Sequence, residues 1–96
     1  MNEKELYKQK FQAQLDEWKA DIAKLKAKAA GAKADAQIEM NKHVKELDRK
    51  IQEANTKLSE LASASEDAWD TAKRGVESSW GSLKAAFRDA ASKFKN

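Results

Sequence analysis

One apolar stripe with helical spacing runs through the first 61 residues and constrains this chain more than any other feature. Its members follow one another by three or four residues, or by sums of those steps, which places them on one face of an α-helix. The stripe repeats at intervals of eleven residues in Tyr7, Trp18, Ala29, Met40 and Ile51. Shorter stretches show heptad spacing. This mixture predicts a long, nearly straight amphipathic helix.

The composition favours the same fold class. The 96 residues include no proline, and Ala, Lys, Glu, Gln and Leu are abundant. Proline is the strongest helix breaker, and these five residue types are among the best helix formers. β-branched residues are sparse, and no stretch alternates with the period of two that a half-buried strand would show. We therefore expect an all-α protein with a single domain over residues 1–96.

Two places can interrupt the helix. Gly31 costs roughly 1 kcal/mol relative to alanine in a helix interior, but alanines flank it instead of turn-forming residues. In the segment 63–67, serines come directly before Glu66 and Asp67, which is typical of a helix N-cap. We therefore predict a long helix over about 3–61 (within 1–62), a turn at 63–67 and a C-terminal amphipathic helix over about 66–94 (extending to 95), folded as a helical hairpin or coiled coil. The alternative is a three-helix bundle that also breaks near Gly31.

The C-terminal helix carries an aromatic-rich apolar face. This face consists of Trp69, Val76, Trp80, Leu83, Phe87 and Phe94. A helix of this length covers only about half of the long helix, and each Å² of apolar surface left wet forgoes about 25 cal/mol. We therefore expect the uncovered half to meet a second copy of the chain in a homo-oligomer. The expected self-association residues are Tyr7, Phe11, Leu15, Trp18, Ile22 and Leu25.

The charge pattern bears on the kinds of partner. The net charge is +3, from 19 basic and 16 acidic residues, and the two signs are interleaved. A dedicated nucleic-acid binder has a concentrated basic face, so this pattern argues against a nucleic-acid partner. The aromatic, Lys- and Arg-bearing helix over 66–95 suggests a membrane surface as an alternative partner. Its acidic residues dilute the attraction to anionic lipids.

The residues that usually carry chemistry give little sign of a reaction. No cysteine is present, which excludes a disulfide, a thiolate zinc site and a cysteine nucleophile. His43 is the only histidine, and we interpret it as a residue at the edge of the stripe with acidic neighbours instead of half a metal site. No serine has the histidine or lysine partner of an activated nucleophile. We expect no enzyme, cofactor or metal.

The sequence also suggests a location. The first residues lack the apolar core of a signal peptide. No window approaches the roughly 18 to 20 apolar residues that a membrane span needs. We therefore expect a cytoplasmic protein.

Several strings resemble a known family. They are LDEW at 15–18, IAKLKAKAAGAKADAQIE at 22–39, SEDAW at 65–69 and AAFRDAASKFK at 85–95. Together they resemble the small bacterial coiled-coil proteins grouped as a stress-response family and first noted in cyanobacteria. The resemblance spans roughly residues 6–95, and SEDAW and the C-terminal string are its most specific parts. It implies a short helical protein of bacterial stress physiology and brings no catalytic site with it.

Overall fold

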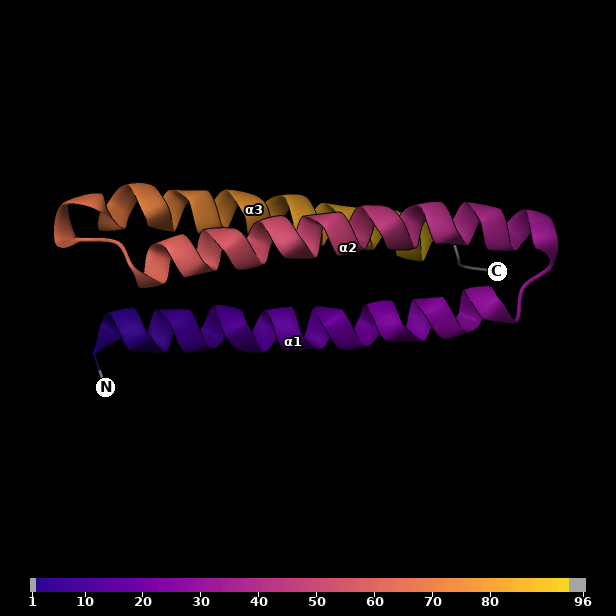
Figure 1. Ribbon diagram of the computed structural model, residues 1–96, viewed down its shortest axis with the longest axis horizontal. Coiled ribbons are helices and arrows are strands. Elements are labelled where there is room, and N and C mark those ends of the chain that lie inside the picture. Colours follow the sequence, from indigo (N-terminus) through magenta and orange to yellow (C-terminus); the bar gives the residue numbers. More distant parts are fainter. Residues whose placement is uncertain (1, 94–96) are drawn as a thin grey trace.

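The computed structural model describes residues 2–93, which form a bundle of three α-helices (Figure 1). These are α1 (Glu3–Ala30), α2 (Ala34–Ala62) and α3 (Glu66–Lys93). α1 and α3 run in the same direction, and α2 runs in the opposite direction. The bundle measures 51 × 21 × 18 Å, and no strand occurs among the described residues. The predicted all-α class is confirmed.

The predicted continuity of the helix over 3–61 is wrong, and the alternative with a break near Gly31 is the one that the structure has. α1 ends at Ala30, and the Gly31 backbone N–H donates to the Lys28 carbonyl oxygen at 3.2 Å. The physical reason is burial. Folding back at this turn lets α2 cover the apolar stripe of α1, and this burial outweighs the few helical hydrogen bonds that a turn of three residues gives up.

The turn at 31–33 is the less strongly specified of the two turns. At the start of α3 the Ser65 hydroxyl oxygen accepts from the Ala68 backbone N–H at 3.3 Å, so the predicted serine cap is confirmed. At the start of α1 the Asn2 side chain accepts from the Glu5 backbone N–H at 2.9 Å. The N-cap residue of α2 is Lys33, and it makes no such bond. A side-chain cap contributes about 0.5–2 kcal/mol, so α2 begins without this stabilisation.

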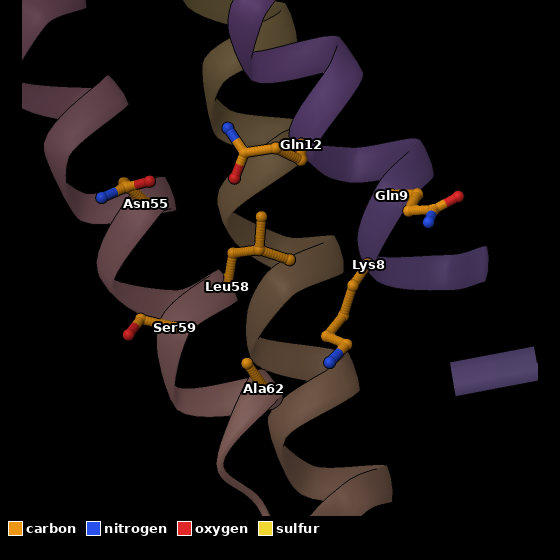
Figure 2. Close-up of a pocket in the computed structure, with 7 residues that line it drawn as sticks. All are labelled: Lys8, Gln9, Gln12, Asn55, Leu58, Ser59 and Ala62. Atoms are coloured by element: carbon orange, nitrogen blue, oxygen red, sulfur yellow. The ribbon is translucent and has the colours of Figure 1, made fainter. Parts of the chain in front are cut away.

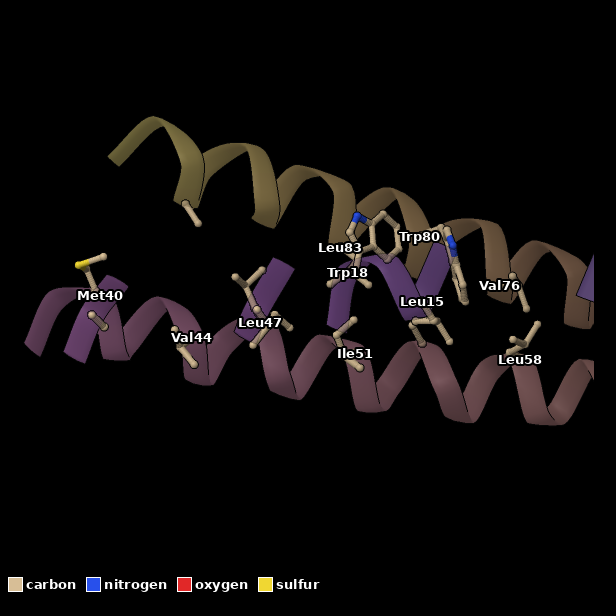
Figure 3. Packing of buried hydrophobic residues seen from close by; sticks show 14 of the residues in the cluster. Leu15, Trp18, Met40, Val44, Leu47, Ile51, Leu58, Val76, Trp80 and Leu83 are labelled. Carbon is tan, nitrogen blue, oxygen red and sulfur yellow. The ribbon is translucent and has the colours of Figure 1, made fainter. Parts of the chain in front are cut away.

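The interior of the bundle is apolar throughout. α2 supplies the largest share of it, and Figure 3 shows the labelled side chains of this helix pointing toward its two neighbours. The buried residues of α2 are Met40, Val44, Leu47, Ile51, Ala54, Leu58 and Leu61. No polar or charged residue among those described is buried. The specificity of this core therefore depends on shape and packing.

A pair of leucine substitutions in α1 tests this arrangement. Leu15 is fully buried and Leu6 is 52% exposed. We expect Leu15→Ala to lower the free energy of unfolding by about 2–5 kcal/mol, because it leaves a cavity. Leu6→Ala should change it by roughly 0.5 kcal/mol or less, as surface substitutions do. Urea unfolding followed by circular dichroism measures both, and equal losses would contradict the position of α1 in the bundle.

Candidate functional site: the aromatic seam between α1 and α3

Helices α1 and α3 meet through aromatic rings instead of through closely spaced backbones. Within residues 2–93, no Cα atom of α1 lies within 8 Å of one in α3, whereas α2 approaches both helices that closely. The space is filled by six rings that we call the aromatic seam. Its members are Tyr7, Phe11 and Trp18 from α1, and Trp69, Trp80 and Phe87 from α3. α2 contains no Phe, Trp or Tyr, so these residues gather on one side of the bundle.

The seam begins near the N-terminal ends of α1 and α3. The ring centroids of Tyr7 and Trp69 lie 5.9 Å apart in an edge-on pair, and those of Tyr7 and Phe11 lie 4.6 Å apart. Two ammonium groups cover these rings from outside. The Nζ atom of Lys4 lies 5.0 Å from the Trp69 ring, and that of Lys73 lies 5.2 Å from the Tyr7 ring. Each such contact contributes about 0.5–1 kcal/mol at an exposed site.

The middle of the seam is centred on Trp80. This indole meets Phe11 edge-on at 4.7 Å between centroids and Trp18 at 5.9 Å. Trp18 in turn stacks on Phe87 at 5.7 Å with an interplanar angle of 15°. Aromatic pairs contribute about 0.5–1.5 kcal/mol each beyond the burial of their area. The seam therefore supplies the aromatic contacts that link α1 to α3.

The indole N–H group of Trp80 has no hydrogen-bond partner among the described residues. The Trp80 side chain is 8% exposed, and its Nε1–H group is buried. A buried donor without a partner costs about 1–3 kcal/mol. The surrounding rings offer area and stacking but no oxygen, so this position gains its stability from packing alone.

Tyr7 and Glu77 join α1 to α3 by a polar contact. The Tyr7 hydroxyl donates to the Glu77 Oε1 atom at 3.2 Å. Partial burial of the tyrosine is the main influence, and the hydrogen bond and negative charge of Glu77 add to it. Together they raise the pKa of Tyr7 to about 12. The neutral hydroxyl is favoured because its ionised form would lose this bond and would stand beside a carboxylate.

The structure places the six residues expected for self-association inside the chain's own core. Leu15, Trp18 and Ile22 are buried, and Tyr7, Phe11 and Leu25 are partly buried against them. The premise that this half of the stripe lacks a cover is therefore wrong. The break at Gly31 supplies two covering helices where the hairpin would have supplied one. Self-association stays a prediction, and it needs a route other than an uncovered stripe.

The predicted C-terminal apolar face also lies against the core. Val76, Trp80 and Leu83 are buried, and Trp69 and Phe87 are partly buried against them. Phe94, the last predicted member of this face, lies outside the described residues. The periodicity of the sequence identified which side of α3 is buried. It did not reveal that the aromatic residues of this side meet those of α1.

A cleft of about 380 Å³ lies beside the seam, between α1 and α3. This volume falls within the range of small-molecule pockets, roughly 300–1,000 Å³. The lining residues are Lys10, Phe11, Gln14, Trp18, Trp80, Gly81 and Lys84. The cleft was not predicted from the sequence, although Gly81, a glycine inside the helix predicted over 66–94, was a signal that could have pointed to it.

A second hollow, between α1 and α2, is less suited to binding a ligand. It has a volume of about 420 Å³ and is lined by Lys8, Gln9, Gln12, Asn55, Leu58, Ser59 and Ala62 (Figure 2). Figure 2 shows the side chains of Asn55 and Ser59 pointing away from α1, and that of Gln9 pointing away from α2. Few polar groups therefore converge on this space. A binding site needs such convergence to fix the orientation of a ligand.

The remaining candidates add no chemical centre. His43 lies at the edge of the core, and its Nε2 atom is 3.7 Å from the Glu39 Oε1 atom. Across the described part of the chain, no group of three His, Cys, Asp or Glu residues is placed to hold a metal ion. No helix in that part is long and apolar enough to cross a membrane.

Comparison with known proteins gives no relative. No protein family, curated protein or solved structure matches this chain. The resemblance to the bacterial stress-response family, and the role that it implies, stay predictions.

Tyr7 offers a spectroscopic test of the seam because it is the only tyrosine in the chain. We expect its tyrosinate absorbance to appear near pH 12. Glu77→Gln should move the midpoint toward the ordinary value of about 10. It should not restore that value completely, because burial is the larger cause of the shift. Ionisation of Tyr7 near pH 10 in the unchanged chain would contradict the contact with α3.

The same shift predicts how stability depends on pH. The folded pKa lies above the unfolded one, so the stabilisation is fully present below about pH 10 and is lost as the pH rises toward 12. Tyr7→Phe has no ionisable group at this position and should lose less stability than the unchanged chain over that interval. Urea unfolding of both proteins at matched pH values measures the difference. An identical decline in both would contradict this assignment.

Proposed function

We propose that this chain is a non-enzymatic, self-associating helical protein whose copies exchange α1. One observation carries the proposal: the buried face of α1 continues in phase into α2. Ala29 and Met40, on either side of the turn, are both buried and are separated by eleven residues. Eleven residues make three turns of a helix, so the two positions would share one face if the helix were straight. A chain that only ever formed the closed bundle would not need the buried faces of α1 and α2 to align across the turn.

The turn at 31–33 is suited to act as a hinge. Gly31 has φ −92° and ψ 0°, which is already in the right-handed helical region. Lys33, with φ −65° and ψ 156°, differs from a helical residue mainly in ψ. None of the described residues has a positive φ. At Gly31 and Lys33, straightening the turn therefore needs mainly a change in the ψ angle of Lys33, and it adds helical hydrogen bonds where α2 now lacks a side-chain cap.

In the open form a single helix would run over 3–62 and measure about 90 Å at 1.5 Å per residue. The α1 segment of each copy would then pack on α2 and α3 of the other copy. The aromatic seam and the apolar core would re-form with the same partners from a second chain. Closed and exchanged forms would differ mainly in the hinge, so the protein concentration would set their ratio. The stress-related part of this function rests only on the family resemblance.

Two substitutions at the hinge act in opposite directions. Ala34 is the first residue of α2, where proline is well accepted, and Lys33 before it has the extended conformation that proline requires. Ala34→Pro should therefore keep the closed turn. It should oppose a straight helix by about 3 kcal/mol or more, because the proline would lie in its interior. We expect Ala34→Pro to stay monomeric over the concentration range in which the unchanged chain associates.

Gly31→Ala should favour the exchanged form. A Cβ at Gly31 would come no closer than 3.8 Å to the Lys28 oxygen, so alanine fits the turn. Alanine favours a continuous helix by up to roughly 1 kcal/mol per chain, and part of this gain is shared by the closed turn, where Gly31 is already in the right-handed helical region. We therefore expect the dimer dissociation constant to fall severalfold. Gly75→Ala in α3 is the matched control and should leave that constant unchanged. Sedimentation equilibrium measures all four proteins. Association of Ala34→Pro as strong as that of the unchanged chain would sink the exchange of α1.

A second candidate function is peripheral binding to a membrane or another hydrophobic surface through α3. The observation that favours it is the seam, where the backbones are furthest apart and where no polar residue among those described is buried. Separation of α1 from α3 would present the face with Val76, Trp80 and Leu83 to an interface. Vesicle flotation with tryptophan fluorescence tests this. Absence of a blue shift with both neutral and anionic vesicles would rule it out.

A further inference from the structure

The cleft between α1 and α3 combines an aromatic floor with a cationic rim. Phe11, Trp18 and Trp80 contribute ring surfaces to it, and Lys10 and Lys84 contribute ammonium groups. No aspartate or glutamate of residues 2–93 lines it. Apolar surface together with unopposed positive charge matches a molecule that has an apolar body and a negative end.

Gly81 keeps one wall of the cleft open without serving the packing of the protein. It lies inside α3, where glycine costs roughly 1 kcal/mol relative to alanine. A Cβ built at this position meets no heavy atom within 4 Å. At Gly75, in the same helix, a Cβ would lie 3.7 Å from the Lys57 side chain. The fold therefore gives no reason for a glycine at 81, whereas access to the cleft does.

The lysines of the rim are available to a ligand. Over residues 2–93, Lys84 takes part in no ion pair, and Lys10 contacts only the Phe11 ring, 6.0 Å from its centroid. Some lysines elsewhere lie beside carboxylates; Lys26, for example, lies 3.3 Å from Asp48. An anion in the cleft would lie beside both lysines and meet no carboxylate among the residues that line it.

We propose that this cleft binds one molecule of a medium-chain fatty carboxylate. Its alkyl chain lies on Phe11, Trp18 and Trp80, and its carboxylate lies between Lys10 and Lys84. The burial of the floor favours a single alkyl chain over a membrane surface. Trp18 and Trp80 are only 9% and 8% exposed, so a planar surface would reach them only if α1 and α3 separated. The closed bundle suffices for this binding, which therefore does not depend on exchange of α1.

Isothermal titration calorimetry with dodecanoate, below the concentration at which it forms micelles, tests the proposal. We expect saturable binding of one molecule per chain. Dodecyltrimethylammonium has the same alkyl chain with a positive head group, and we expect it to bind at least several-fold more weakly. Equal affinity for the two probes, or no saturable binding of dodecanoate, would overturn the proposal.

Two pairs of variants locate the site. Gly81→Leu fills the cleft and should weaken dodecanoate binding by roughly tenfold or more, and Gly81→Ala should weaken it less. Gly75→Ala, the glycine control in the same helix, should bind as the unchanged chain does. Lys84→Gln should weaken binding by roughly twofold to fivefold, as expected for an exposed charge pair. Lys42→Gln on α2 should have no effect.

The variants also separate this site from its alternatives. Circular dichroism shows whether Gly81→Leu is folded. If it is not, the two single variants Lys84→Gln and Gly81→Ala still show whether the cleft is the binding site. Unchanged dodecanoate binding in the folded Gly81 and Lys84 variants would overturn the cleft as the site. Flotation with phosphatidylglycerol vesicles tests whether the ligand is a membrane surface instead. Vesicle binding with the same dependence on Gly81 and Lys84 would replace the free carboxylate with a membrane surface as the ligand.

Discussion

The burial of the apolar face of α1 by α2 is the interaction on which the rest of the structure depends. An isolated amphipathic helix gains little until its apolar face meets another helix. This chain meets the requirement internally, because a turn of three residues at 31–33 brings two halves of one stripe together. α2, with buried residues from Met40 to Leu61, then forms the common wall against which α1 and α3 pack. The exchange of α1 follows from the same stripe, since its phase fits both a folded and a straight helix.

The aromatic seam has a different role from the contacts of α2. Aliphatic side chains let α2 lie close to both neighbours, whereas the larger rings keep α1 and α3 apart. Rings such as Trp18 and Trp80 fill most of this space without closing it, and the cleft beside them is the remainder. Aromatic residues occur on two helices and not on the third. This distribution produces both the ring contacts between α1 and α3 and the candidate binding site beside them.

The sequence predicted the features that local signals determine. Helical periodicity gave the all-α class and the buried faces, and the serine and acids before Trp69 gave the second turn. The break at Gly31 was predicted only as the alternative because its local signal is weak. Gly31 has no turn-forming neighbours, and Lys33 offers no cap, so the energy of tertiary burial decides where the chain folds. The spacing of apolar residues along the sequence does not show how large that energy is for each possible fold.

The residues that cover the stripe and the candidate cleft also could not be predicted from local sequence signals. The spacing of Tyr7 through Leu25 correctly identified an apolar surface, but not that the partner was the same chain. The cleft arises from residues about 70 positions apart, such as Lys10 and Lys84. Its volume depends on how far the rings hold two helices apart. Such a distance is a property of the assembled bundle, and only the odd placement of Gly81 hinted at it.

The most direct test of exchange is the distance between α1 and α2 within a single chain. The absence of cysteine allows one pair of spin labels to be placed at Gln12→Cys and Asn55→Cys, on opposite sides of the same hollow. Labelled chain diluted in excess unlabelled chain reports only distances within one molecule, by pulsed electron paramagnetic resonance. We expect a short distance alone in dilute samples and, in concentrated samples, a second population near 65 Å, which is 43 residues of straight helix at about 1.5 Å each. A dimer that shows only the short distance would contradict the exchange of α1.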